Sequence, residues 1–314
     1  MEIGDPSLDS MVTSLRKLIK DSGNPLVAIA TTSHPMFLFL EKIGAISFLK
    51  CTSELFDYGN TSMNTHKEKG IDGNNPLSFI EAFLHKIQNT EDPSHPHFGE
   101  RGELNLRNVL LDLFAAGSDT TANSLNWAML YMILNPEIQE KVREELKINI
   151  GNKKVKMSER NLTPYTEAVI HEISRKGKIL PLAVFHATSA PINVHHYKIP
   201  SRTVIFPLIG DIMHDPEHFP NPSKFDPDRY LTKDENGDLK FVPNPHVIPF
   251  GIGKRRCLGE AMARTTLYKF FTAIIQKYKV ISGQNEPIID KVVNGFVSSP
   301  QTFKMKFVKI WQFE

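Results

Sequence analysis

The chain has 314 residues, of which 40% are hydrophobic, and this is enough to bury a large core in one or two domains. Its 37 basic and 35 acidic side chains nearly cancel, so no overall field favours binding to nucleic acid. Cys51 and Cys257 are too few for a disulfide framework or a four-thiolate metal site. No apolar run is long enough to span a bilayer, and the N-terminus lacks a signal-peptide pattern, so we expect no membrane anchor in this sequence.

The first half of the chain predicts helices joined by polar segments. Mixed helical periodicity in residues 1–75 is followed by a helix that starts at Pro76. Residues 91–102 contain two prolines and two glycines and predict an exposed loop. Residues 103–134 are hydrophobic on most faces, as expected for a helix through the centre of a protein.

The second half predicts further helices and several short strands. Pro136 suits the first position of a helix that runs to residue 146, and residues 164–176 predict another. Beyond them the pattern changes to short β-like runs and turns, a last helix is expected at 261–277, and residues 292–310 alternate like a hairpin. The whole predicts a mainly α fold with a minor β part.

The sharpest motif is the glycine-rich run from Phe250 to residue 259, FGIGKRRCLG. Gly251 and Gly253 allow backbone conformations that let the loop lie flat against a planar group. Cys257 comes just before a predicted helix, whose positive end stabilises a thiolate, while Phe250 can screen the sulfur and Arg255 can pair with a carboxylate. A lone cysteine after a glycine turn is usually structural, but six fixed positions coincide by chance only about 10⁻⁸ times per window.

This run resembles the haem-binding loop of the cytochrome P-450 family, in which the cysteine is the axial ligand of the haem iron. The resemblance implies that Cys257 is that ligand, that Phe250 and Gly251 shape the haem site, and that Arg255 pairs with a haem propionate. Chains of this family normally begin with a membrane anchor, a β-rich lobe and a propionate-binding helix, none of which we find. We therefore expect the cytochrome P-450 fold lacking its N-terminal lobe.

The same resemblance predicts one partial haem-monooxygenase domain over residues 1–314. Its expected parts are variable distal helices at 1–75, a helical core at 76–180, and β segments with the cysteine loop and the last helix at 181–314.

A second motif, AGSDTT, lies midway along the long apolar segment. Glycine followed by threonines is poor helix-forming sequence, and hydroxyls there can bond to carbonyls of the preceding turn and open a groove. Taken alone, the motif is better explained as a tolerated kink in the helix. The resemblance implies that the Thr120 hydroxyl and the Asp119 acid deliver protons during oxygen activation. Ala116 and Gly117 would leave room for dioxygen.

Glu172 and Arg175 are three residues apart and share a helical face, a pattern that usually marks a solvated pair. The preceding His171 makes this stretch half resemble a zinc-protease helix, but the second histidine is missing. The resemblance adds Arg229, from the run FDPDR, and implies a buried triad behind the cysteine loop. It also implies that His186 binds a haem propionate, although an ordinary surface histidine is the competing interpretation.

Substrate contacts are expected on the long helix, after the helix of Glu172, and in the C-terminal hairpin. They fall on Phe114, Ala115, Ala183, Val184, Phe296 and Val297. These residues are apolar, which suits a lipophilic substrate, and any hydrophobic core would also show them. The segments around Pro76 and residues 294–300 look most similar to the microsomal clan, near the insect branch that contains methyl farnesoate epoxidase.

The resemblance implies a haem-thiolate monooxygenase that inserts one atom of dioxygen into a lipophilic molecule by hydroxylation or epoxidation. A terpenoid hormone precursor and a xenobiotic are both candidate substrates. Electrons would come from NADPH through NADPH–cytochrome P-450 reductase, at the cytosolic face of the endoplasmic reticulum membrane for a full-length form. The alternative is a truncated, non-catalytic remnant with weak or no haem binding. A haem-thiolate isomerase is disfavoured by the Asp119–Thr120 pair.

Overall fold

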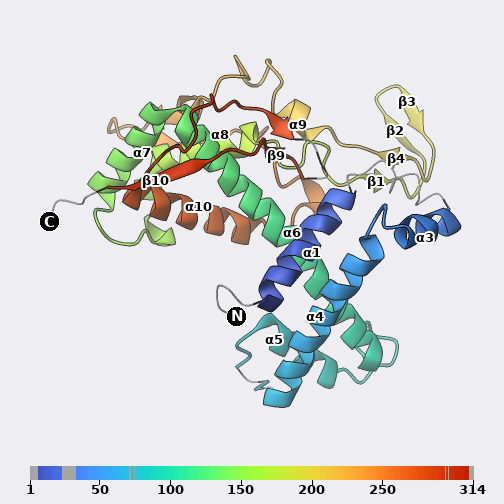
Figure 1. The fold of residues 1–314 in the computed structure, drawn as a ribbon. Helices are drawn as coiled ribbons and strands as arrows, with labels where there is room; N and C mark the ends of the chain where they lie inside the picture. The colour runs from blue at the N-terminus through green and yellow to red at the C-terminus, as the bar shows by residue number, and fades with distance from the viewer. Residues whose placement is uncertain are drawn as a thin grey trace. The chain divides into compact units, whose positions relative to one another are not determined.

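The computed structural model describes residues 6–22, 33–70, 72–73, 75–293, 295 and 297–310. Within it the chain divides into two compact units, Met1–Asp119 and Thr120–Glu314. The division falls inside one continuous helix, α6 (Gly99–Leu134), drawn in green in Figure 1. The single partial domain expected from the sequence, with its three parts, stays a prediction.

The first unit is built from helices, and α1 contacts α4 along its length. The helices are α1 (Pro6–Ser22), α3 (His34–Lys42), α4 (Phe48–Lys69), α5 (Phe79–Gln88) and the N-terminal part of α6. Two apolar clusters hold the unit together, one between α1 and α4 around Leu15 and Leu55, and one where Met63, Leu84 and Leu106 meet.

Two helix starts in this unit differ from the sequence expectation. The helix expected from Pro76 begins at Phe79, because the Ser78 hydroxyl accepts a hydrogen bond from the Glu81 backbone N–H and caps it there. The loop expected at residues 91–102 is shorter, since α6 already begins at Gly99. Gly102 continues that helix: its N–H donates to the Phe98 carbonyl at 3.1 Å, and a Cβ here would lie 2.4 Å from the His97 carbonyl oxygen.

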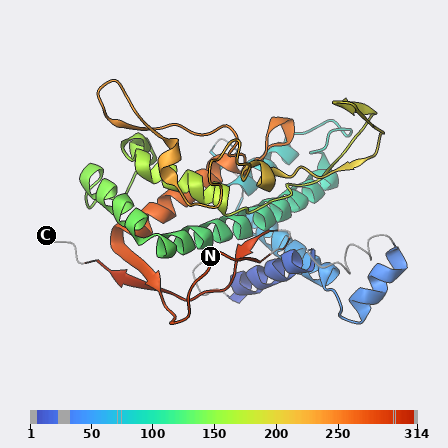
Figure 2. The same ribbon diagram turned by 90° about the horizontal axis from the view of Figure 1, so that it is seen from above.

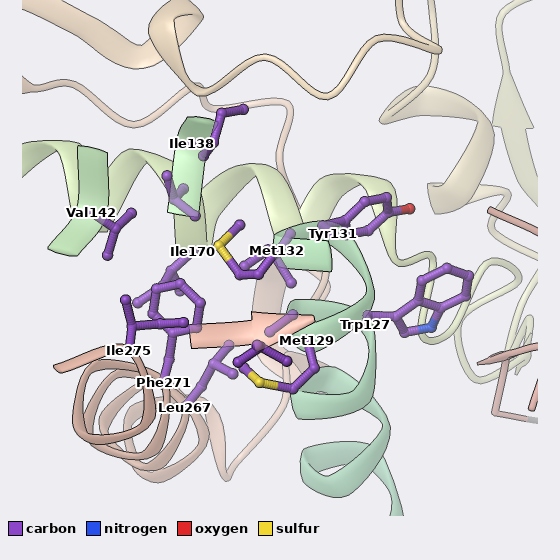
Figure 3. Close-up of a cluster of buried hydrophobic side chains, with 14 of the residues drawn as sticks. Trp127, Met129, Tyr131, Met132, Ile138, Val142, Ile170, Leu267, Phe271 and Ile275 are labelled. Carbon is purple, nitrogen blue, oxygen red and sulfur yellow. The ribbon is translucent and has the colours of Figure 1, made fainter. Parts of the chain in front are cut away.

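The second unit is organised around four helices. The C-terminal part of α6 packs with α7 (Pro136–Asn149), α8 (Pro164–Lys176) and α10 (Glu260–Lys277) around one buried cluster. Figure 3 shows Trp127 and Met132 of α6, Ile170 of α8 and Phe271 of α10 in this cluster. A continuous buried run in α6 is confined to residues 127–132, so the expectation that the whole segment of residues 103–134 is a central helix holds only for this part.

Helix α8 has the bounds that the sequence predicts. Pro164 occupies its first turn, and the Glu145 carboxylate of α7 accepts hydrogen bonds from the backbone N–H groups of Tyr165 and Thr166, at 2.7 and 2.8 Å. The expected inward residues Ala168, Val169 and Ile173 are all buried. The same helix also buries charged residues, whose partners are described with the candidate site.

The larger elements are connected by short helices. These are α9 (Ile209–Ile212) and three 3₁₀ helices, η1 (Met157–Leu162), η2 (Pro227–Tyr230) and η3 (Gly253–Arg255).

The strands form antiparallel pairs rather than one sheet among the described residues. The pairs are β1 (His186–Ala187) with β4 (Val204–Ile205), β2 (Ile192–Val194) with β3 (Tyr197–Ile199), β5 (Leu231–Lys233) with β6 (Leu239–Phe241), β7 (Tyr278–Ser282) with β10 (Met305–Lys309), and β8 (Val292–Val293) with β9 (Ser299–Pro300).

The C-terminal tail is only partly the hairpin that its alternation predicts. Strands β8 and β9 pair as a short hairpin, but β10 pairs with β7, which directly follows α10. Phe307 of β10 stands opposite Val280 of β7, and Val280 belongs to the buried core. Phe307 itself is 45% exposed, so the pairing rests on the backbone register, which runs from Met305 opposite Ser282 to Lys309 opposite Tyr278. In Figure 2 this orange-to-red pair lies towards the C-terminus.

The fold class predicted from the sequence, mainly α with a minor β part, is confirmed. In the part of the chain that the structure describes, no helix has both the length and the apolarity needed to cross a membrane.

Candidate functional site

The cysteine loop is a closed turn in the second unit. The Cys257 backbone N–H donates to the Phe250 carbonyl at 2.8 Å and joins the two ends of the loop. Gly251 and Gly253 adopt φ of +72° and +76°, in the left-handed region that favours glycine. A Cβ at either glycine would meet nothing within 4 Å, so backbone conformation rather than crowding requires glycine.

The loop presents its thiol to the surface. Cys257 is exposed, whereas Cys51 in the first unit is buried. The apolar side chains of Ile252, Leu258 and Met262 on either side of the cysteine are 74%, 89% and 76% exposed. Exposed apolar groups gathered along one short segment are typical of a surface that an apolar ligand covers.

The residues of this loop fit a haem. The accessible Cys257 thiol lies just ahead of α10, whose N-cap is Gly259, and the positive end of a helix stabilises a thiolate. The Arg255 guanidinium at the end of η3 is exposed and can pair with a propionate. His186, the second residue expected to bind a propionate, is exposed in β1. Among the described residues no group of three or more His, Cys, Asp or Glu side chains could hold a bare metal ion.

Next to the loop is a hollow of about 290 Å³, and Phe250 is one of its lining residues. The Arg264 guanidinium lies 4.8 Å from the centre of the Phe250 ring, and its Nε is 2.9 Å from the Glu260 Oε1. Phe250 was expected to screen the sulfur. The structure shows that its carbonyl closes the loop and that its ring packs under a cation of α10.

Behind the loop, the structure brings the three residues of the expected triad together. Glu172 and Arg175 are fully buried, and Arg175 donates from Nε and Nη2 to the two carboxylate oxygens of Glu172, both at 2.7 Å. The Arg229 Nε lies 3.5 Å from the Glu172 Oε1. A bidentate pair shielded from water needs further polar partners, because burial of charge is costly.

Those further partners were missed by sequence reasoning. The Tyr230 hydroxyl donates to the Glu172 Oε2 at 2.6 Å, and the Asp226 backbone N–H donates to Oε1 at 3.0 Å. Arg175 donates to the carbonyls of Met213 and Pro222, each at 2.9 Å. Burial, and then the adjacent Glu172 charge, raise the pKa of Tyr230. The only sequence signal was a tyrosine directly after Arg229.

His171, dismissed as half of a zinc motif, also has a partner in this region. It is 5% exposed, and its Nε2 accepts a hydrogen bond from the Asn244 backbone N–H at 3.3 Å. Burial, reinforced by the positive charge of Arg264, lowers the pKa of His171 to about 4. Its imidazole is therefore neutral at neutral pH, as the acceptor role requires.

The residues of the AGSDTT motif lie on α6, which is helical throughout this stretch. Ala116, Gly117 and Asp119 belong to the first unit, and Thr120 begins the second. Ser124 makes one side-chain bond to a carbonyl of the preceding turn, because its hydroxyl donates to the Thr120 carbonyl at 2.8 Å. The sequence did not single out Ser124, and the bonds expected from the threonine hydroxyls stay a prediction.

The residues expected to contact substrate have different surroundings. Phe114 and Ala115 pack against the apolar cluster between α1 and α4 of the first unit. In the second unit, Ala183 has a φ of +46° and Val184 is 56% exposed. Val297 is half-buried, and Phe296 lies outside the described residues.

Residues 1–307 match the family model described as cytochrome P450 (here written P-450). Cytochrome P-450 2C3 of Oryctolagus cuniculus is 37% identical over 251 residues, which are 77% of this chain and 49% of that protein. Cytochrome P-450 2A13 of Homo sapiens is 36% identical over 246 residues, 77% of this chain and 48% of that protein. The chain thus spans about half the length of the curated relatives it matches. With the cysteine loop and the Glu172 network, these matches show that the chain belongs to the cytochrome P-450 family.

Proposed function

We propose that this chain is the haem-binding part of a monooxygenase that inserts one atom of dioxygen into a lipophilic organic molecule. The observation that carries the proposal is the exposed Cys257 thiol in a glycine loop ahead of α10, in a chain that belongs to the cytochrome P-450 family. A haem bound there supplies the activation of dioxygen, and thiolate ligation favours cleavage of the O–O bond.

The remaining site residues have proposed roles around that group. Cys257 ligates the iron, Gly251 keeps the loop flat, and the side chains of Arg255 and His186 bind the propionates. On α6, Ala116 and Gly117 leave space for dioxygen, and the Asp119 carboxyl passes protons to the Thr120 hydroxyl. Glu172, Arg175 and Arg229 hold the segments behind the loop.

The proposed substrate is lipophilic, because Ala183, Val184 and Val297 are apolar and only partly covered. Hydroxylation or epoxidation of a terpenoid hormone precursor, as in the insect branch near methyl farnesoate epoxidase, is the finer proposal, and a xenobiotic is the other candidate. The terpenoid proposal is supported by the sequence resemblance around Pro76 and residues 294–300. The relatives described above are both mammalian.

The ligand assignment is tested by replacing Cys257 with alanine in the intact protein. We expect the thiolate-type Soret band of the reduced carbon monoxide complex to disappear, because no other described cysteine is exposed. Cys51→Ala is the matched control and should keep the band, since Cys51 is buried in α4. Loss of the band in Cys51→Ala but not in Cys257→Ala would make the assignment wrong. An intact wild-type protein that takes up no haem would favour the non-catalytic alternative.

Electron delivery is proposed to come from NADPH–cytochrome P-450 reductase at the cytosolic face of the endoplasmic reticulum. Lys254 and Arg256 are exposed in the cysteine loop and can attract an acidic partner, whereas Arg264 is already paired with Glu260. We expect Lys254→Glu with Arg256→Glu to slow reduction by about tenfold at low salt and to weaken its salt dependence. Arg264→Gln should have a smaller effect. Rates unchanged by the double reversal would show an ordinary solvated cluster.

A further inference from the structure

The segment that leads into the cysteine loop, residues 242–249, is held against α8 by a hydrogen bond and by apolar packing, in which the partly buried Ile248 also takes part. The polar contact is the hydrogen bond from the Asn244 backbone N–H to the His171 Nε2. The apolar packing includes Val247, which is 6% exposed and belongs to a buried cluster with Ala168 of α8 and Tyr230. The segment is therefore docked on α8 at Asn244, through His171, and three residues later at Val247.

Hydrogen bonds continue from this docking point to the cysteine. The Asn244 side-chain Oδ1 accepts from the His246 N–H at 2.8 Å, and its carbonyl accepts from the Val247 N–H at 3.1 Å. Further along, the Gly251 N–H donates to the Ile248 carbonyl at 3.0 Å, and Phe250 closes the loop onto Cys257. Each step is short in sequence, so a displacement of Asn244 is passed to the loop through a few linked turns.

The surroundings of His171 keep it an acceptor. The Tyr230 ring meets it edge-on at 4.7 Å between centroids and the Phe241 ring at 5.4 Å, so the imidazole is enclosed by aromatic groups. The charged groups that act on it are Arg264 of α10 and Arg160 of η1, and both disfavour a second positive charge. A neutral imidazole carries one proton, so when Nε2 accepts from the Asn244 N–H the proton of His171 is on Nδ1.

His171 also joins two parts of the site in the chain itself. The next residue is Glu172, the centre of the buried network, and Tyr230 contacts both: its ring packs on His171 and its hydroxyl binds Glu172. We propose that His171 is a positioning residue, which, as an uncharged acceptor, fixes the segment 242–249 and through it the place of the Cys257 thiolate. The inference rests on the proposed function only where it concerns the thiolate.

The test compares two substitutions in the intact protein. His171→Phe keeps an aromatic ring against Tyr230 but removes the acceptor, and His171→Gln offers an amide oxygen to Asn244 without the ring. His214→Phe is the matched control: His214 is another histidine of the second unit with a lowered pKa, but it is half-buried and its Nδ1 lies 3.0 Å from the Gly210 carbonyl oxygen.

The first readout is amide hydrogen exchange measured by mass spectrometry. We expect exchange of peptides covering residues 242–250 to be about tenfold faster in His171→Phe, the factor for a loss of ~1.4 kcal/mol in one buried hydrogen bond. Peptides of α7 should be unchanged, and His171→Gln should restore most of the protection. A wild-type rate for residues 242–250 in His171→Phe would overturn the inference, as would an equal acceleration in His214→Phe.

The second readout is pH. Because the pKa of His171 is about 4 in the folded protein, below its ordinary value near 6.5, the fold binds fewer protons than the unfolded chain between these values. Stability from His171 is complete above about pH 6.5 and is lost as pH falls towards 4. Protection of residues 242–250, corrected for intrinsic exchange, should fall over this window in the wild type and not in His171→Phe.

The third readout connects His171 to the thiolate. The thiolate-type Soret band of the reduced carbon monoxide complex should be lost several-fold faster in His171→Phe than in the wild type or His171→Gln, with His214→Phe like the wild type. Equal decay in all four proteins would remove the thiolate part of the inference. If the wild type shows no such band, the proposed function fails, and the exchange measurements still decide the role of His171.

Discussion

Replacement of Arg175 by methionine is expected to lower the free energy of unfolding by about 3–5 kcal/mol, the range for removal of one partner of a buried ion pair. The Arg175 side chain is fully buried and donates to Glu172 and to the carbonyls of Met213 and Pro222. Its guanidinium also lies 5.0 Å from the centre of the Phe219 ring. Methionine fills much of the volume but removes the Arg175 donors from the buried Glu172 carboxylate and from these carbonyls.

The measurement is urea unfolding of the variant beside a matched control. Lys224→Met removes an ion pair with Asp226 whose lysine is 66% exposed, and this should cost less than about 1 kcal/mol. Arg175→Met combined with Glu172→Gln should recover part of the loss, because the second change removes the uncompensated negative charge. A loss below about 1 kcal/mol for Arg175→Met would contradict the interpretation of Glu172 and Arg175 as a structural pair.

Replacement of Thr120 by alanine is expected to leave haem binding intact and to lower product formed per NADPH consumed by about tenfold or more, as for loss of a proton-transfer group. The consumed electrons should appear as hydrogen peroxide. This follows from the proposed role of the Thr120 hydroxyl, which sits on α6 directly after Asp119. The measurement is the ratio of product and peroxide to NADPH oxidised, with a substrate that the intact protein accepts.

Thr121→Ala is the control for this variant. Thr121 is the next residue of the same helix and is also half-buried. The alanine substitution therefore removes a hydroxyl in a similar position that has no part in the proposed proton path. We expect its coupling of NADPH to product to stay near the wild-type value. Coupling that is unchanged in Thr120→Ala, or reduced equally in both variants, would remove Thr120 from the proposed mechanism.

The amino-acid sequence by itself predicted the features that depend on neighbouring residues. Helix α8 has its predicted bounds because Pro164 and the polar residues around it set a local start, and its apolar period placed Ala168 and Ile173 in the core. The cysteine loop was recognised because a thiolate site needs glycine, arginine and cysteine at fixed short spacings. In both cases the information lies within one or two turns of chain.

Only the tertiary structure decided which distant groups bind the buried polar side chains and which strand pairs with β10. The Tyr230 hydroxyl binds Glu172 across 58 positions, and the Asn244 N–H binds His171 across 73. Likewise β10 pairs with β7 rather than extending the tail hairpin, and the register sets Phe307 opposite the buried Val280. Hydrogen-bond donors of this kind are backbone or common side-chain groups, so their identity leaves no mark in sequence spacing. Burial makes each partner necessary, and the packing of α8 selects the one that is within reach.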